Sequence, residues 1–287
     1  MTTEARMTTA YDIAILLPTR GRDGMLERSI KSLFELAADP SRIQLMLAFD
    51  RDDTLGIQHF TNHIQPWLDS REIDYHAMEF EPLGYIRLNE YVNTLAANSD
   101  ANWLVFWNDD AVMETQDWDA TIMSYQGQFK LLAFHTHHDH PYSIFPIVPR
   151  AWFDLLGYLS PHQISDAWLS QQAYILDIWQ RIPVDVLHDR HDLTGNNDDP
   201  TFRNRPMLEG NPLDSRDFHS IAQSNRRLAD CAKIATYLKL EFGQDMSWFE
   251  KVITGQQDPW EKLKSNDVNN QMKQFKLTIK DNAIRID

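Results

Sequence analysis

The feature that most constrains the fold is a regular alternation of short apolar runs with segments of helical periodicity. Four segments have the length and apolar content of strands: 13–17, 43–49, 71–80 and 101–107. Three intervening segments repeat apolar residues at helical spacing: 24–38, 57–68 and 83–97. Continuous apolarity is typical of strands buried on both faces. The order β-α-β-α-β-α-β therefore predicts an α/β fold with a mostly parallel central sheet and helices on both faces.

The second half of the sequence is less regular. Helices are predicted at four amphipathic segments: 118–126, 165–182, 218–242 and 245–253. Strands are predicted at 129–134 and 183–192, and the composition of 193–206 is that of a loop. Pro18 is expected to end the first strand. Ser165 is expected to be the N-cap of the helix at 165–182. We expect a flexible tail at 1–10, an α/β domain at 11–215 and a helical C-terminal extension at 216–287.

The charge balance excludes some partners. With 27 basic and 42 acidic residues, the formal net charge is −15, which disfavours binding to a nucleic-acid backbone. Acidic clusters suit divalent cations, although solubility explains the charge equally well. No apolar run approaches the ~20 residues that span a bilayer, and residues 1–10 have no apolar signal core. Together with the single cysteine, Cys231, this predicts a cytoplasmic protein without a membrane span. It predicts nothing about oligomeric state.

Polar residues follow three of the predicted strands at their carboxyl ends. These ends read PTRGR at 18–22, DRDD at 50–53 and NDD at 108–110. In open α/β sheets, ligands bind outside the carboxyl ends of the strands. Buried carboxylates without partners are costly. Asp109 and Asp110 therefore either form a solvated strand end or hold a positive group.

These motifs, in this order, resemble those of GT-A-type, nucleotide-sugar-dependent glycosyltransferases. The sequence is most similar to the inverting, family-2-like group that opens with a Pro-Thr-x-Arg/Asn motif, and the resemblance covers residues 12–200. It implies a Rossmann-like GT-A fold and a catalytic role for the domain at 11–215. It also implies a nucleoside-diphosphate sugar as donor, a carbohydrate or other hydroxyl as acceptor, and direct displacement with inversion.

The resemblance implies donor-binding roles for seven residues: Pro18, Thr19, Arg20, Arg22, Asp50, Arg87 and Asn89. The chain around Pro18 would cup the nucleotide base, and Asp50 would bind the base or the ribose. A guanidinium suits phosphate, which favours phosphate contacts for the arginines of PTRGR. Arg87 and Asn89 stand near the Arg-Asn position of the family, offset by about one residue.

The NDD segment stands where the family has its Asp-x-Asp motif. The resemblance implies that Asp110 binds Mn²⁺ or Mg²⁺, which prefer oxygen ligands. Asp109 would support it from the ribose or from behind the metal. Asn108 replaces the first acid of the motif and brings no charge, although its carbonyl can still accept a hydrogen bond. A further metal or phosphate ligand is implied after the last core strand, where His188 and His191 both remain candidates.

An inverting transferase needs a general base for the acceptor hydroxyl. The family takes it from an acid near the start of a helix, and Asp166 fits that position in GYLSPHQISDAWL. A helix N-terminus favours an ionised carboxylate, so an ordinary first-turn acid is the alternative. Trp152 and Trp168 flank the expected acceptor site and are candidates for stacking on a sugar.

The segment HTHHDH leaves a second function open. Imidazole is a common metal ligand, and His135 and His137 would share one face of a strand. This predicts, as an alternative, a metal-dependent hydrolase with ligands among His135–His140. Its spacing differs from the H-E-x-x-H pattern of zinc hydrolases, and a histidine-rich loop also explains it. A third reading is a catalytically inactive nucleotide-sugar-binding protein, because fold alone does not fix activity.

Overall fold

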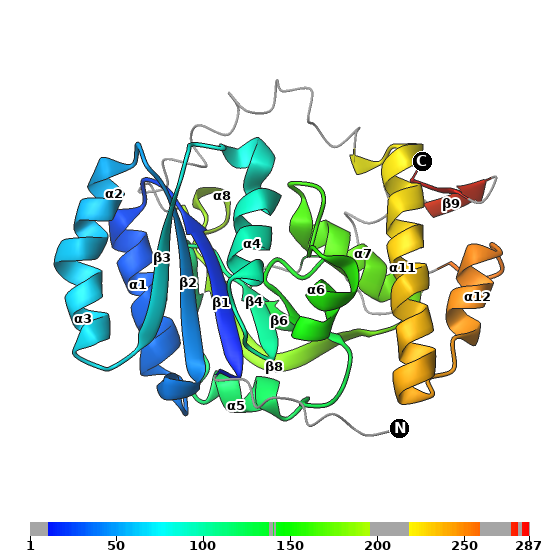
Figure 1. Cartoon of the computed structure of the whole chain (residues 1–287), viewed down its shortest axis with the longest axis horizontal. Coiled ribbons are helices and arrows are strands. Elements are labelled where there is room, and N and C mark those ends of the chain that lie inside the picture. The colour runs from blue at the N-terminus through cyan, green and yellow to red at the C-terminus, as the bar shows by residue number, and fades with distance from the viewer. Residues whose placement is uncertain are drawn as a thin grey trace.

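The computed structural model describes residues 11–137, 140, 142–195, 218–258, 277–280 and 283–286, which are coloured in Figure 1. At residues 191, 192, 277–280 and 283–286 it describes the backbone alone. The predicted tail at 1–10, most of the predicted loop at 193–206, and His138 and Asp139 lie outside the described residues.

One eight-stranded sheet forms the centre of the molecule, in the order β3-β2-β1-β4-β7-β6-β8-β5. Its strands are β1 (Ile13–Thr19), β2 (Ile43–Asp50), β3 (Asp74–Phe80), β4 (Trp103–Phe106), β5 (Ala111–Met113), β6 (Leu131–Thr136), β7 (Pro146–Pro149) and β8 (Trp179–His188). The pairs β1–β2, β1–β4, β2–β3 and β6–β8 are parallel, whereas β7 runs antiparallel to β4 and β6, and β5 antiparallel to β8. This confirms the predicted α/β fold with a mostly parallel sheet.

Helices cover both faces of the sheet. They are α1 (Asp23–Glu35), α2 (Thr54–His59), α3 (Gln65–Asp69), α4 (Leu88–Ala97), α5 (Trp118–Met123), α6 (Arg150–Leu156), α7 (Ser165–Leu176), α8 (His191–Thr194), α11 (Ile221–Phe242) and α12 (Ser247–Ile253). Short helical turns are η1 (Pro40–Arg42), η2 (Phe60–Ile64) and η3 (Tyr85–Arg87). Figure 1 shows α1, α2 and α3 on one side of the sheet, α4, α6 and α7 on the other, and α11 and α12 beyond α7.

Adjacent residues of β1 belong to two different cores, which explains the continuous apolar run. Ile15 lies in the same buried cluster as Ile30 of α1, and its neighbour Leu16 lies in the cluster of Leu95 of α4. All four side chains are fully buried. Successive strand residues point to opposite faces, so a strand between two helical layers must be apolar at every position.

The C-terminal helices pack onto this core. Cys231, Ile234 and Leu238 of α11 are buried in one cluster with Leu169 of α7 and Trp152 of α6. Trp152 and Trp168 are both 0% exposed, with their rings against Phe129 and Arg227 respectively. Neither ring face is available to stack on a sugar, contrary to the expectation from the sequence. The C-terminal extension, expected to be helical, also contains an antiparallel strand pair, β9 (Leu277–Lys280) with β10 (Ala283–Ile286).

Both expected ends of the helix at 165–182 are wrong. The helix predicted at 165–182 ends at Leu176, because Asp177 adopts a left-handed conformation (φ 57°) that terminates it. The apolar residues that follow belong to β8. Ser165 is the first helical residue and not the cap; its hydroxyl donates to the carbonyl of His162.

Pro18 does not end the first strand, which continues to Thr19. Beyond Leu16, β1 pairs only with β2, where Pro18 stands opposite Ala48. The edge toward β4 is open at this point, so the missing N–H of proline removes no ladder hydrogen bond there.

None of the helices in the described part of the chain combines the length and apolarity needed to cross a bilayer.

Candidate active site

The carboxyl ends of β1, β2 and β4 bring residues far apart in the sequence to one edge of the sheet. Thr19 donates a 2.8 Å hydrogen bond from Oγ1 to Oδ2 of Asp109, which follows β4. Arg20 pairs with Asp50 at 2.7 Å and with Asp52, both from the end of β2. Hydrogen bonds and ion pairs thus link the three polar strand ends, as their placement in a parallel sheet predicts.

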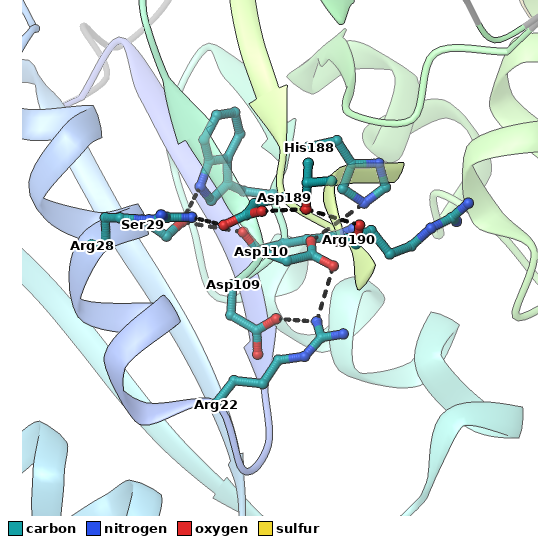
Figure 2. A network of polar contacts seen from close by, with 11 residues as sticks. Arg22, Arg28, Ser29, Asp109, Asp110, His188, Asp189 and Arg190 are labelled. Carbon is teal, nitrogen blue, oxygen red and sulfur yellow. Dashed lines mark hydrogen bonds and ion pairs between the residues drawn. The ribbon is translucent and has the colours of Figure 1, made fainter. Parts of the chain in front are cut away.

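Arg22 joins the two adjacent carboxylates. Its Nη1 donates to Oδ1 of Asp109 at 2.6 Å and to Oδ2 of Asp110 at 3.1 Å, and Figure 2 shows the guanidinium reaching both. Burial, together with the neighbouring Asp110, raises the pKa of Asp109 against the opposing effect of Arg22. Burial would also raise the pKa of Asp110, but His188, Arg22 and Arg190 outweigh it and lower that pKa. The pair is therefore a buried anionic site with one close cationic partner.

His188 lies on the other side of Asp110. The β5–β8 ladder places His188 opposite Ala111, and the N–H of Asp189 donates to the carbonyl of Asp110 at 2.8 Å. Nε2 of His188 is 3.4 Å from Oδ1 of Asp110, and both residues are 3% exposed. Neither this Asp110 oxygen nor Nδ1 of His188 has a hydrogen-bond partner among the described residues. Two buried side chains of types that commonly bind metals thus lie close together, and each has one polar atom without a hydrogen-bond partner among the described residues.

This arrangement fits a divalent cation with few protein ligands. Adjacent ligands of an octahedral ion at about 2.1 Å lie about 3.0 Å apart, close to the 3.4 Å between Asp110 and His188. No set of three or more His, Cys, Asp or Glu in the described residues is arranged to hold a metal. An ion here would therefore need non-protein oxygen ligands, and Mg²⁺ in particular takes them from water and substrate phosphates.

Asp166 opens α7 and shares the electrostatic environment of this cluster. Its side chain is half-buried, and burial raises its pKa. His140 and His188 oppose that rise through their charge, which places Asp166 within electrostatic reach of the His188 side of the site. An acid whose pKa is raised, beside a candidate ligand site, has the properties of a general base.

Other predicted donor residues have contacts elsewhere. The guanidinium of Arg87, at the end of η3, binds Glu90 in the first turn of α4 and is half exposed. No described contact joins Arg87 or Asn89 to the carboxylate cluster. The backbone carbonyl of Asn108 accepts a 3.2 Å hydrogen bond from the hydroxyl of Ser29, which ties this loop to α1. These three residues stay predictions as ligand contacts.

The second histidine candidate lies in α8. This short helix spans His191–Thr194, and the side chain of His191 is outside the described part of the structure. Asp189 accepts from Arg28 of α1 and from Oγ1 of Thr194 at 2.6 Å, as part of the network in Figure 2. The sequence did not single out Arg28 or Asp189. Their contacts fix the end of β8 and thereby the position of His188.

Tyr91 is a further site residue that the sequence did not reveal. Its hydroxyl donates to Oδ1 of Asp50 and accepts from the N–H of Leu83 at 2.9 Å. Burial, with the charge of Asp50, raises the pKa of Tyr91 to about 12. A tyrosine among the apolar positions of α4 was the available signal, because a buried hydroxyl needs a partner. It fixes the orientation of the Asp50 carboxylate.

The histidine-rich segment does not form one cluster in the described residues. His135 pairs with Asp185, and His137 pairs with Glu114, each at 2.5 Å. Both imidazoles are about half exposed. Each therefore has its own carboxylate, and two further residues of the segment, His138 and Asp139, lie outside the described residues.

Comparisons with known proteins yield distant structural similarity. No family model and no curated protein sequence matches this chain. Solved structures that align with it include S. aureus TarS, at 10% identity and a TM-score of 0.49, over 79% of this chain and 43% of that one. A mannosyltransferase, PcManGT from Pyrobaculum calidifontis in complex with GDP-Man and Mn²⁺, aligns at 10% identity and a TM-score of 0.49, over 91% of this chain and 87% of that one.

This chain thus spans less than half the length of that TarS chain. A shorter TarS structure in complex with UDP aligns over 96% of both chains, at 10% identity and a TM-score of 0.49. Similarity at this level assigns no activity to this chain. Any activity has to be argued from the residues of the site.

Proposed function

We propose that the protein is an inverting, metal-dependent glycosyltransferase that moves a sugar from a nucleoside-diphosphate donor to an acceptor hydroxyl. The observation that carries the proposal is the buried pair of Asp110 and His188 with unused bonding capacity, at the strand ends where α/β sheets bind ligands. The motif order described above supports the same function.

The donor would lie along the ends of β1 and β2. Asp50 is held through both oxygens, by Tyr91 and by Arg20, so its carboxylate is pre-oriented for a base or ribose. Arg20 is half exposed and can exchange an exposed carboxylate for a donor phosphate. Arg22 is close enough to Asp110 to face the same diphosphate.

Asp110 and His188 would hold Mn²⁺ or Mg²⁺, with Asp109 fixed behind them by Thr19 and Arg22. When bound, such an ion stabilises negative charge on a departing diphosphate. Arg22 would act on the same charge without a metal, since its guanidinium already lies against both carboxylates. The chain thus supplies one fixed cation and the side chains for a second.

Asp166 would take the proton of the acceptor hydroxyl. The acceptor oxygen then bonds to the anomeric carbon as the bond from that carbon to the diphosphate oxygen breaks, which inverts the centre in one displacement. The raised pKa of Asp166 makes its carboxylate a stronger base than an ordinary aspartate. The proton ends on Asp166 and the negative charge on the nucleoside diphosphate.

A nucleotide panel tests this function. Thermal unfolding is measured with UDP, GDP, CDP and dTDP, each with and without Mn²⁺, for the wild type, Asp110→Asn and the control Asp52→Asn. A ligand at 100 times its Kd adds about 2.7 kcal/mol, or roughly 5–10 °C. We expect one nucleotide to give a Mn²⁺-dependent shift that Asp110→Asn loses and Asp52→Asn keeps. Absence of a shift with every nucleotide contradicts the proposal.

Asn108 supports a second candidate, a nucleotide-sugar-binding protein without turnover. It stands in place of the first acid of the motif and removes one negative charge from the proposed cation site. This candidate predicts the same nucleotide shift but no release of nucleoside diphosphate in the presence of donor and acceptors. The hydrolase alternative has less support, because His135 and His137 each bind a separate carboxylate.

A further inference from the structure

Arg227 of the C-terminal helix α11 is buried against α7, and none of the described carboxylates pairs with it. Arg227 is 1% exposed, and its guanidinium stacks on Trp168 at 4.7 Å and on Phe218 at 4.4 Å. Its Nη2 donates to the carbonyl of Phe218 at 3.0 Å and makes a longer contact of 3.4 Å with the hydroxyl of Ser224. Its Nη1 has no hydrogen-bond partner among the described residues.

The nearest acid on the same helix is committed elsewhere. Asp230 accepts from the hydroxyl of Tyr158 at 2.8 Å and 3.0 Å, and from Gln172 at 3.2 Å. None of the described carboxylates forms an ion pair with Arg227. The positive charge is therefore buried without compensation, which is costly and uncommon in proteins.

A second unused donor lies on the ring that Arg227 stacks on. Nε1 of Trp168 is buried and has no hydrogen-bond partner among the described residues. Ordered water could accept from both donors, but it would leave the charge uncompensated. Burial lowers the pKa of Arg227 to about 10, so the guanidinium still carries its charge at neutral pH. The guanidinium of Arg227 and the indole of Trp168 each have one free donor nitrogen, and together with the positive charge these donors suit an anion.

The position of this cation relates it to the candidate active site. Trp168 and the proposed base Asp166 both belong to the first turn of α7, which lies between the sheet and α11 in Figure 1. The hydroxyl of Tyr142, which accepts from Gln171 at 3.2 Å, is within electrostatic reach of both Arg227 and Asp166. Tyr142 and Asp166 are half-buried, so part of each side chain contacts solvent.

We infer that Arg227 and the indole N–H of Trp168 form an anion subsite that binds a carboxylate or phosphate group of the acceptor. The protein would then act on an acidic acceptor, such as a uronic acid or a phosphorylated sugar or polyol, and not on a neutral one. The inference rests on the proposed function only in naming the anion as part of the acceptor. Anion binding itself is independent of nucleotide and metal.

Matched small probes test the subsite without donor or metal. Glucose, glucuronate and glucose 6-phosphate differ in the group at one carbon, and their effect on thermal unfolding is measured for the wild type. We expect glucuronate, glucose 6-phosphate or both to raise the melting temperature, and glucose to leave it unchanged. The anion that gives the larger shift identifies the group that the acceptor carries. Equal effects of all three sugars contradict the inference.

Two arginines adjacent in sequence provide the matched variants. Arg227→Met should weaken anion binding at least about tenfold, since one hydrogen bond to a charged group accounts for that factor. Arg226→Met removes an exposed guanidinium one residue away and should bind the anion as the wild type does. Anion binding that survives in Arg227→Met overturns the inference.

Trp168→Phe keeps the subsite testable if Arg227→Met does not fold. This variant retains an aromatic ring under the guanidinium and removes only the indole donor. Anion affinity reduced severalfold supports the subsite, and unchanged affinity contradicts it. A nucleotide shift with no anion effect would refute the subsite alone, whereas an anion effect with no nucleotide shift would refute the proposed function alone.

Discussion

The two buried charged regions of this molecule are balanced in opposite ways. Asp109 and Asp110 lie at the carboxyl ends of the parallel strands, and Arg22 from the neighbouring strand end binds both. Arg227 lies between α7 and α11 against two aromatic rings, with no carboxylate beside it among the described residues. The first region already contains its countercharge and a second position, between Asp110 and His188, for another cation. The second region contains no countercharge among the described residues, which is why we infer that a ligand supplies it.

This difference predicts how each region responds to ligands. The carboxylate region should need a cation and a diphosphate together, because two protein side chains alone hold a metal weakly. The Arg227 region should respond to an anion alone.

Asp166→Asn should have the largest effect, a loss of about 10²–10⁴ in turnover, because it removes the proposed general base. Nucleotide binding should persist, since the donor side chains stay in place. Turnover and nucleotide-induced stabilisation are measured on the same preparation, with the exposed Asp154→Asn as control. Turnover close to that of the wild type would exclude Asp166 as the base.

Arg22→Met should destabilise the protein by about 3–5 kcal/mol, because it leaves two buried carboxylates without their close cation. Denaturant unfolding measures the loss. The double variant Arg22→Met/Asp109→Asn should recover a large part of it by removing one of the uncompensated charges. No recovery would mean that Arg22 stabilises through packing and not through charge.

The pH dependence of turnover should follow Asp166. Its folded-state pKa is raised by burial, so the carboxylate becomes available as a base only as the pH rises through that raised value. The stability of the folded protein should change with pH in the opposite direction to turnover. Between about 3.9, the ordinary pKa of aspartate, and the raised value, the folded state binds more protons, so stability falls as the pH rises. Asp166→Asn should flatten that fall in pH-dependent unfolding experiments; a curve identical to that of the wild type would contradict the raised pKa.

Arg227→Met should have the smallest effect on stability without ligand, within about 1 kcal/mol of the wild type. Removing an uncompensated buried charge offsets the lost hydrogen bond to Phe218. Denaturant unfolding beside Arg22→Met gives a direct contrast between two buried arginines. Equal, large losses in both variants would show that Arg227 is also balanced within the protein.

Part of this arrangement was predictable from sequence. β1, β2 and β4 were found because strands buried on both faces need apolar residues at every position, as Ile15 and Leu16 illustrate. The polar ends of those strands meet because neighbouring parallel strands end at one edge. Asp109 and Asp110 could therefore be singled out together before their partners were known.

The rest depends on contacts between distant segments. β5, from Ala111 to Met113, is too short to show a periodicity, yet its ladder with β8 brings His188 to Asp110. α7 ends at Leu176, and apolar residues resume directly after Asp177, so the hydrophobic pattern does not separate the helix from β8. In the sequence, Arg227 is only one position of a predicted helix. That no described carboxylate pairs with its guanidinium is evident only once α11 is packed on α7.

The most direct test of the central claim is a calorimetric titration of Mn²⁺ into the protein, with and without the nucleoside diphosphate that the panel selects. We predict weak Mn²⁺ binding alone, binding at least tenfold tighter with the nucleotide, and loss of that coupling in Asp110→Asn. The same Mn²⁺ affinity with and without nucleotide, or unchanged coupling in Asp110→Asn, would contradict the assignment of Asp110 and His188 as the cation site of a nucleotide-sugar transferase.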